Sequence, residues 1–194
     1  MACFEKYKSI PTDLQLKLFD SLVTPILLYS AEVWGFENKG NIEKMHLQFC
    51  KKILKVRNST PNFTVYGELG RLPLEIMVEQ KLVLFWNSML FNNQKLSSIM
   101  YKLMLRLHEN NPKRFKWISY TKSIMDDCGL SFMWNDQVPI DKFLLKTTIR
   151  QKLSDQFIQH CFSQINNASR GEFYSLFKNE FQLKSYLIKL TQGE

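Results

Sequence analysis

Two pairs of side chains in this sequence are of types that could carry out chemistry. The first is Asp126 and Asp127, and adjacent carboxylates can hold magnesium ions for phosphoryl transfer. The pair falls at the end of a predicted helix, where neighbouring side chains point about 100° apart. Metal catalysis needs ligands that converge on one point. We therefore interpret the pair as a solvated helix end, and a metal nuclease is the weakest of our functional hypotheses.

The second pair is His46 and Cys50, which are four residues apart and could face one metal ion from a single helix. Both belong to an apolar stripe, so core packing is the simpler interpretation. The four cysteines (Cys3, Cys50, Cys128 and Cys161) form no CxxC pair. The sequence also has no glycine-rich phosphate loop, serine nucleophile elbow or HExxH helix. It therefore predicts no enzyme activity, no metal and no cofactor.

Basic side chains are the better candidates for a binding role. The net charge is +8 and the pI is near 9.3, which suits a polyanionic partner such as nucleic acid. Residues 44–57 contain five basic residues and no acidic one, and a second set follows one helix face at i, i+4, i+8 spacing. The predicted nucleic-acid-binding residues are Lys44, Lys51, Lys52, Lys55, Arg57, Lys142, Lys146 and Arg150. A smaller group, Lys113, Arg114 and Lys116, precedes Trp117.

The elements that must position these residues are helices. Glycine is scarce, with seven in 194 residues, and hydrophobic residues make up 45%, which together favour an all-α fold with a sizeable core. Helical spacing predicts one helix from Thr12 to Gly35, kinked at Pro25 or divided there. A second begins at Gly40-Asn41 and buries a stripe opposite the first basic set, formed by Ile42, Met45, His46, Phe49, Cys50, Ile53 and Leu54. Further helices are predicted over 61–70, from Pro73, and over 97–109, 114–128, 140–166, 171–180 and 182–190.

Domain organisation and compartment follow from a few signals. Asn110-Asn111-Pro112 is the clearest linker, so we expect a helical bundle over residues 1–110 and a second helical layer over 113–194. The apolar stretch at 18–35 is too short to span a membrane, and the first residues lack a secretory signal. Sparse cysteines suit a reducing compartment, so the chain is expected inside the cell, in the nucleus or cytoplasm, without a membrane partner.

One stretch carries a resemblance to a known family. "LFDSLVTPILLYSAEVWG", residues 18–35, resembles the thumb-region helix of non-LTR (LINE-type) retrotransposon reverse transcriptases, in which an apolar helix ends in Leu-Tyr-Gly-x-Glu-x-Trp. Ser30 stands where the family has glycine. The matching residues are Leu28, Tyr29, Glu32, Val33, Trp34 and Gly35. The segments that resemble the same family further on are 42–76, Phe85-Trp86, 95–101, 154–159 and 174–187.

The resemblance implies a thumb and connector segment of an RNA-directed DNA polymerase. The family's aromatic-x-Asp-Asp motif, expected upstream, and its Cys/His zinc segment, expected downstream, are both absent from this sequence. The expected role is therefore to grip an RNA–DNA or DNA duplex by its backbone, regardless of sequence and next to a separate palm. The alternative is a helical scaffold or protein-interaction module, which includes the case of a relic reading frame, with no nucleic-acid role.

Single residues on the expected thumb helix carry two further expectations. Trp34 and Trp86 are predicted to lie in the core rather than to stack on bases. Glu32 is expected to pair with an arginine or to cap a neighbouring helix.

Overall fold

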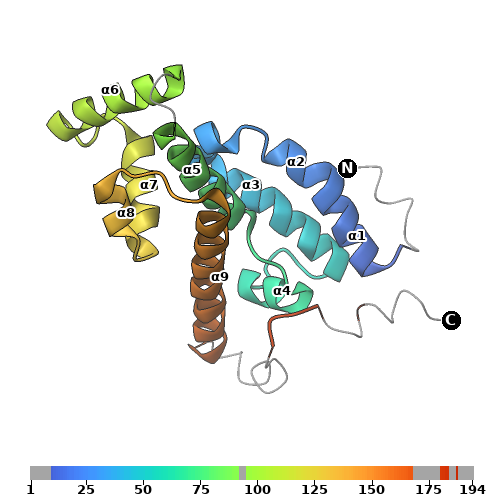
Figure 1. Ribbon diagram of the computed structural model, residues 1–194. Coiled ribbons are helices and arrows are strands. Elements are labelled where there is room, and N and C mark those ends of the chain that lie inside the picture. The colour runs from blue at the N-terminus through green and yellow to red at the C-terminus, as the bar shows by residue number, and fades with distance from the viewer. Residues whose placement is uncertain (1–9, 92–94, 168–179, 184–186, 188–194) are drawn as a thin grey trace. The chain divides into compact units, whose positions relative to one another are not determined.

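The computed structural model describes residues 10–91, 95–167, 180–183 and 187, and the regular structure within them is helical without a strand (Figure 1). This confirms the all-α fold. The elements are α1 (Thr12–Leu18), the π-helical turn η2 (Phe19–Val23), α2 (Thr24–Leu27), α3 (Ala31–Leu54), α4 (Asn62–Leu69), α5 (Leu74–Leu90), α6 (Leu96–Asn110), α7 (Lys116–Asp127), α8 (Ser131–Asp136) and α9 (Lys142–Asn167). The helices predicted over 171–180 and 182–190 lie almost wholly outside the described residues.

The chain divides into two compact units. The first comprises Met1–Tyr29, Ile42–Pro73 and Ile158–Glu194, and the second comprises Ser30–Asn41 and Leu74–Phe157. The division does not follow the boundary predicted at Asn110–Pro112. Helices α6 and α7 lie on either side of that segment, yet both pack against α5 within the second unit. A linker-like sequence here marks a tight connection between two helices of one unit.

The N-terminal helices depart from the expected regular spacing. The wide π-helical turn η2 ends two residues before Pro25, whose missing N–H removes one α-helical hydrogen bond. Because a π turn carries an extra residue, it rotates the side chains that follow it. Helical spacing places Phe19, Leu22, Ile26 and Tyr29 on one face, but only Phe19 of these is buried. After the turn, Thr24 and Leu28 are buried, whereas Ile26 and Tyr29 are exposed.

Helix α3 corrects two predicted boundaries. Gly35 does not end a helix and Gly40-Asn41 does not begin one, because α3 runs through both. The break in the chain comes earlier, at Ser30, whose φ of 50° is incompatible with a right-handed helix. Gly35 is buried against Val78 of α5, so close packing explains why a glycine occurs within the helix.

The second half of α3 follows the predicted pattern. Cys50 lies in the core of the first unit together with Leu16 of α1 and with Val65 and Leu69 of α4. The neighbouring positions of the predicted stripe (Ile42, His46, Phe49, Ile53 and Leu54) are buried or half-buried. Met45 is the exception, because its side chain is more than half exposed. The stripe and its burial are therefore largely as the sequence predicted.

Helix α5 forms the centre of the second unit. Trp86 is fully buried, as predicted, and its ring stacks on that of Trp134 from α8 with centroids 5.3 Å apart. Trp34 differs from the prediction, since its residue exposure of 37% places it at the surface. The short helix α8, which was not predicted from the sequence, thus contributes an aromatic side chain to this core.

Candidate nucleic-acid interface

Helix α3 presents the first basic set on the side opposite its buried stripe. At 100° per residue, Lys44 and Lys51 fall within about 20° of one another, and Lys52 lies about 80° from Lys44. Lys55 and Arg57 follow the last residue of the helix. His46 and Ile53 point the other way, into the first unit. The helix therefore separates the basic side chains from the core, as the sequence predicted.

Most of this set has no partner among the residues that the structure describes. Lys44, Lys52, Lys55 and Arg57 are exposed, and none of them forms an ion pair or hydrogen bond through its side chain with any described residue. Lys51 differs, because it is half-buried and its Nζ donates a 2.8 Å hydrogen bond to the carbonyl of Asn58. Four cations are thus available to a polyanion, while Lys51 has a structural contact of its own.

Lys55 occupies an unusual backbone position at the end of α3. Its φ is 53°, and the N–H groups of Lys55 and Val56 bond the carbonyls of Lys52 and Lys51 respectively, at 3.2 and 3.1 Å. This pair of bonds is the Schellman arrangement, in which glycine is the usual left-handed residue. Gly70 and Gly129 hold the same position after α4 and α7. Lysine is therefore present where the backbone favours glycine.

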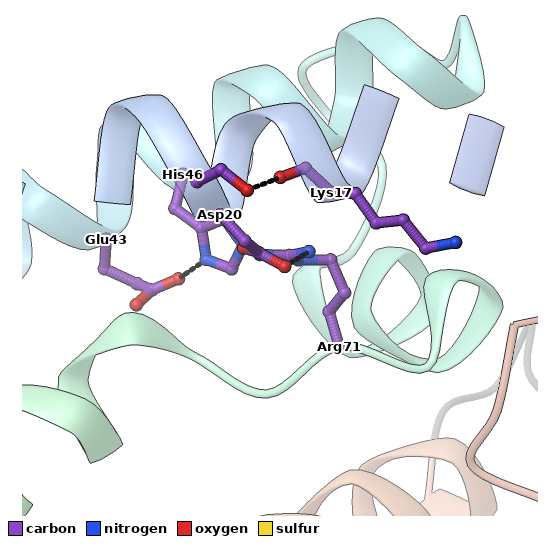
Figure 2. Close-up of polar contacts among 6 residues, drawn as sticks. Lys17, Asp20, Glu43, His46 and Arg71 are labelled. Atoms are coloured by element: carbon purple, nitrogen blue, oxygen red, sulfur yellow. Dashed lines mark hydrogen bonds and ion pairs between the residues drawn. The ribbon is translucent and has the colours of Figure 1, made fainter. Parts of the chain in front are cut away.

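A polar network lies on the opposite, buried side of α3 (Figure 2). His46 Nδ1 is 2.8 Å from Glu43 Oε1, and Arg71 Nε donates a 3.0 Å hydrogen bond to His46 Nε2. Arg71 also forms two hydrogen bonds to Asp20, at 3.0 and 2.5 Å, and Tyr66 donates to Glu43. The network connects η2, α3, α4 and the segment after α4.

This arrangement leaves no ligand atoms for a metal at His46. Both ring nitrogens already have partners, and burial raises the pKa of the Cys50 thiol to about 12. A thiol must lose its proton to bind zinc well. Within the part of the chain that the structure describes, no group of three or more His, Cys, Asp or Glu side chains could hold a metal ion.

The second basic set lies in the second unit. Lys142, Lys146 and Arg150 are all exposed along α9, and their side chains have no partner among the described residues. Lys113 and Lys116 line an open groove of about 880 Å³ together with Phe36 and Tyr120. Lys116 is paired with Glu37 at 3.4 Å. The groove is therefore less basic than its lysines alone suggested.

The acidic pair Asp126–Asp127 lies exposed at the end of α7. Lys122 Nζ lies 2.6 Å from Asp126, and hydrogen bonds from Lys122 and Ser131 hold the pKa of the Asp126 carboxyl below its ordinary value. Asp127 is exposed at the end of α7 and receives a hydrogen bond from Gln156 on its backbone carbonyl. The two carboxylates thus belong to a solvated helix end, as we interpreted them.

The structure also identifies partners that sequence reasoning missed. Glu32 lies 3.7 Å from Lys81, not from an arginine, and its carbonyl accepts a 2.9 Å hydrogen bond from the indole of Trp117. Arg71 and Asp20 are 51 residues apart, and no local pattern pairs them. The only signal in the sequence for such contacts is opposite charge. Many pairs of residues satisfy that condition, so the sequence does not single out these partners.

No family model, curated protein or solved structure matches this chain significantly. Among the described residues, no helix is both long enough and apolar enough to cross a bilayer.

Proposed function

We propose that this chain is the thumb and connector segment of a LINE-type reverse transcriptase, and that it holds a nucleic-acid duplex by its phosphate backbone. In this role the segment binds without catalysing polymerisation, which requires the metal-binding palm. The proposal keeps the interface predicted from the sequence, centred on α3, with α9 as a second contact surface.

The observation that carries the binding function is the set of four exposed cations on α3. Lys44, Lys52, Lys55 and Arg57 have no acidic partner among the described residues, so their charge is not used inside the first unit. Exposed and unpaired lysine and arginine side chains are suited to phosphate contacts, which fix a duplex without selecting its sequence.

The backbone at Ser30 supports the family resemblance. The LINE-type pattern has glycine at this position, and glycine is the residue that most easily adopts a positive φ. In this chain Ser30 has a φ of 50° and forms the break between α2 and α3. The backbone at this position therefore favours the glycine of the family pattern, and the serine of this chain departs from that pattern.

The test is a salt series of duplex binding for the variant Lys44→Gln with Lys52→Gln. Both side chains are exposed and unpaired among the described residues, so the fold should tolerate their loss. Each lost phosphate contact should flatten the slope of log K against log salt by about 0.9 on B-DNA. We therefore expect weaker binding to DNA and RNA–DNA duplexes, with a slope reduced by between about one and two units.

The matched control is Lys95→Gln with Lys102→Gln, which removes the same charge from two exposed positions, one just before α6 and one on it. Lys51→Ala is avoided because it also removes the contact with Asn58. If both double variants bind duplex alike, the α3 set is a solvated face, and the scaffold interpretation replaces the proposal. The variant Lys142→Gln with Lys146→Gln measures the contribution of α9 separately.

A further inference from the structure

Helix α9 carries an exposed aromatic ring among its basic residues. Phe143 is 74% exposed, more than any other phenylalanine that the structure describes. At 100° per residue, Phe143 lies about 20° from Arg150 and about 60° from Lys146 around the helix axis. Lys146 is three residues after Phe143, so the two side chains are neighbours on the helix surface. Lys142 comes directly before Phe143, so the ring lies within a positive surface.

Two amide side chains of α5 fix this orientation of α9. The buried Asn87 donates a 2.8 Å hydrogen bond to the carbonyl of Ile140 and accepts a 2.9 Å bond from its N–H. Gln80, also buried, donates a 2.8 Å bond to the carbonyl of Lys146. The apolar side chains on the inner face of this stretch are buried, and they are Leu145, Ile149 and Leu153. Rotating α9 to cover Phe143 would break the Gln80 bond and expose those side chains.

The acidic residues of this stretch lie away from the ring. Asp141 precedes the helix, and its Oδ1 accepts a 2.8 Å hydrogen bond from the N–H of Leu144, so it caps the first turn. Asp155, the one acidic residue within α9, lies about 120° from Phe143 around the axis. The three basic side chains of this face form no ion pair with either carboxylate. Their charge is therefore available to an anionic ligand.

We propose that the face of α9 formed by Lys142, Phe143, Lys146 and Arg150 binds an unpaired nucleic-acid strand. One base stacks on the ring of Phe143, and the phosphates on either side of that base contact the cations. An exposed aromatic ring on a positive surface is how proteins hold single strands without selecting their sequence. The inference rests on the proposed nucleic-acid role of the chain, and it gives α9 a ligand different from the duplex held by α3.

A duplex is a poorer ligand for the ring. Paired bases are already stacked on one another inside the double helix, so they present only their edges in the grooves. Phosphates are present in both ligands, and the cations of α9 contact either one. Phe143 is therefore the side chain that distinguishes an unpaired strand from a duplex.

A lipid surface also fits this face less well. A helix that lies on a membrane buries a continuous apolar face in the lipid. The exposed apolar side chains of α9 among the described residues are Phe143 and Leu144, and its other large apolar residues are buried or half-buried. Thr147 and Gln151, which continue the line of Phe143 along the helix, are polar and exposed. One ring with polar neighbours is suited to a base rather than to a bilayer.

The experiment measures binding of three labelled probes to the full chain by fluorescence anisotropy. The first is an oligodeoxyadenylate strand of about 12 nucleotides, a length that fits common single-strand sites. The second is an abasic strand of the same length, which keeps the phosphates and lacks the bases. The third is a blunt duplex. We expect the adenylate strand to bind about tenfold more tightly than the abasic strand, because a stacked base contributes about that factor.

Substitutions at Phe143 locate the stacking site. Phe143→Leu should weaken binding of the adenylate strand by about tenfold, and should leave the abasic strand and the duplex unaffected. Phe143→Trp should keep the binding, because it retains a flat ring. The matched control is Phe132→Leu, which alters a phenylalanine of α8 that is 57% exposed and has Asp136 four residues on. This control should bind all three probes as the wild type does.

Two further measurements support the assignment. Lys146→Gln with Arg150→Gln should flatten the slope of log K against log salt for the single strand by about 0.7 for each lost phosphate contact. Ultraviolet cross-linking of the wild-type chain to oligothymidylate, mapped by mass spectrometry, should join a base to the peptide that contains Phe143. Circular dichroism and melting temperature establish that each variant is folded.

Four results would overturn the assignment of α9. The first is unaltered adenylate binding by folded Phe143→Leu. The second is an equal loss for the adenylate and abasic strands in that variant, which would exclude stacking. The third is cross-linking confined to peptides without Phe143. The fourth is binding to phosphatidylserine vesicles that Phe143→Leu abolishes while strand binding is kept, which assigns the face to a lipid surface.

Failure of this inference is distinguishable from failure of the proposed duplex binding. Lys44→Gln with Lys52→Gln tests the duplex contact on α3, and Phe143→Leu tests the strand contact on α9. If only the α3 variant changes binding, the duplex role stands and the assignment of α9 is wrong. If only Phe143→Leu changes binding, α9 holds a strand and the duplex contact on α3 is wrong.

Discussion

Arg71 Nε donates a 3.0 Å hydrogen bond to Nε2 of His46, a side chain with no solvent exposure. A guanidinium can only donate, so His46 Nε2 accepts and the ring proton lies on Nδ1. From there it is donated to the carboxylate of Glu43. His46 is therefore neutral in this arrangement. The bond joins α3 to the segment after α4, while the other end of Arg71 reaches Asp20.

Replacing Arg71 should destabilise the first unit. Arg71→Ala leaves His46 Nε2 buried without a donor, and a buried polar atom that loses its partner costs about 1–3 kcal/mol. We expect the free energy of unfolding, measured in urea, to fall by about 2–3 kcal/mol. Asp20→Asn is the control and should cost less than about 1 kcal/mol, because the Asp20 side chain is half exposed. Equal losses in the two variants would place the stabilisation in the surface ion pair instead.

Lys55→Gly should raise stability and weaken duplex binding together. A glycine relieves the cost of a positive φ, which is about 1 kcal/mol for a residue with a side chain. The same change removes one exposed cation of the α3 set. Thermal unfolding and duplex titration on one preparation measure the two effects. A more stable variant with unaltered binding would mean that Lys55 serves the helix end only.

Two glycines of α3 should respond to alanine with opposite signs. A Cβ at Gly35 would lie 2.7 Å from Val78 Cγ1 and 3.1 Å from Ala31 Cβ, whereas a Cβ at Gly40 meets nothing within 4 Å. Gly35→Ala should therefore destabilise by about 1–2 kcal/mol through overpacking. Gly40→Ala should stabilise by about 0.5–1 kcal/mol through helix propensity. Urea unfolding of both variants tests this, and a gain in stability at Gly35 would contradict the packing.

Stability should fall in alkaline solution as buried thiols resist ionisation. Burial raises the pKa of Cys50 to about 12, and those of Cys128 and Cys161 to about 11, from an ordinary value of 9. Well below pH 9 the thiols are protonated in both the folded and the unfolded chain. As the pH rises toward 11 or 12, only the unfolded chain loses these protons, so unfolding becomes more favourable.

The variant Cys50→Ala tests this assignment. Its unfolding free energy should fall less steeply with pH than that of the wild type above pH 9, by up to about 1.4 kcal/mol per pH unit. Tyrosine and lysine residues titrate in the same range, but they are common to both proteins. Parallel curves for the two proteins would show that the Cys50 thiol does not contribute to the alkaline loss.

Local pattern determined much of the helical structure. The stripe from Ile42 to Leu54 predicted both the helix and its buried side, because side chains three and four residues apart must share one face. Gly70 and Gly129 marked helix ends, since each adopts the left-handed backbone that terminates a helix. The exposure of Lys44 and Lys52 followed from the same geometry. Whether the α3 basic set contacts nucleic acid stays a prediction.

Tertiary packing decided what local pattern leaves open. An amphipathic pattern tells which residues share a face, but not whether that face meets a core. Contacts of Tyr101 with Trp86 and Gln137, 15 and 36 residues away, bury one side of α6 and leave Leu96, Ile99 and Leu103 on its other side exposed. Contact of Gly35 with Val78 likewise allows α3 to continue where the sequence predicted an end. Each of these contacts joins residues that are distant in the chain. They come together only when the whole unit folds, so a local pattern does not reveal them.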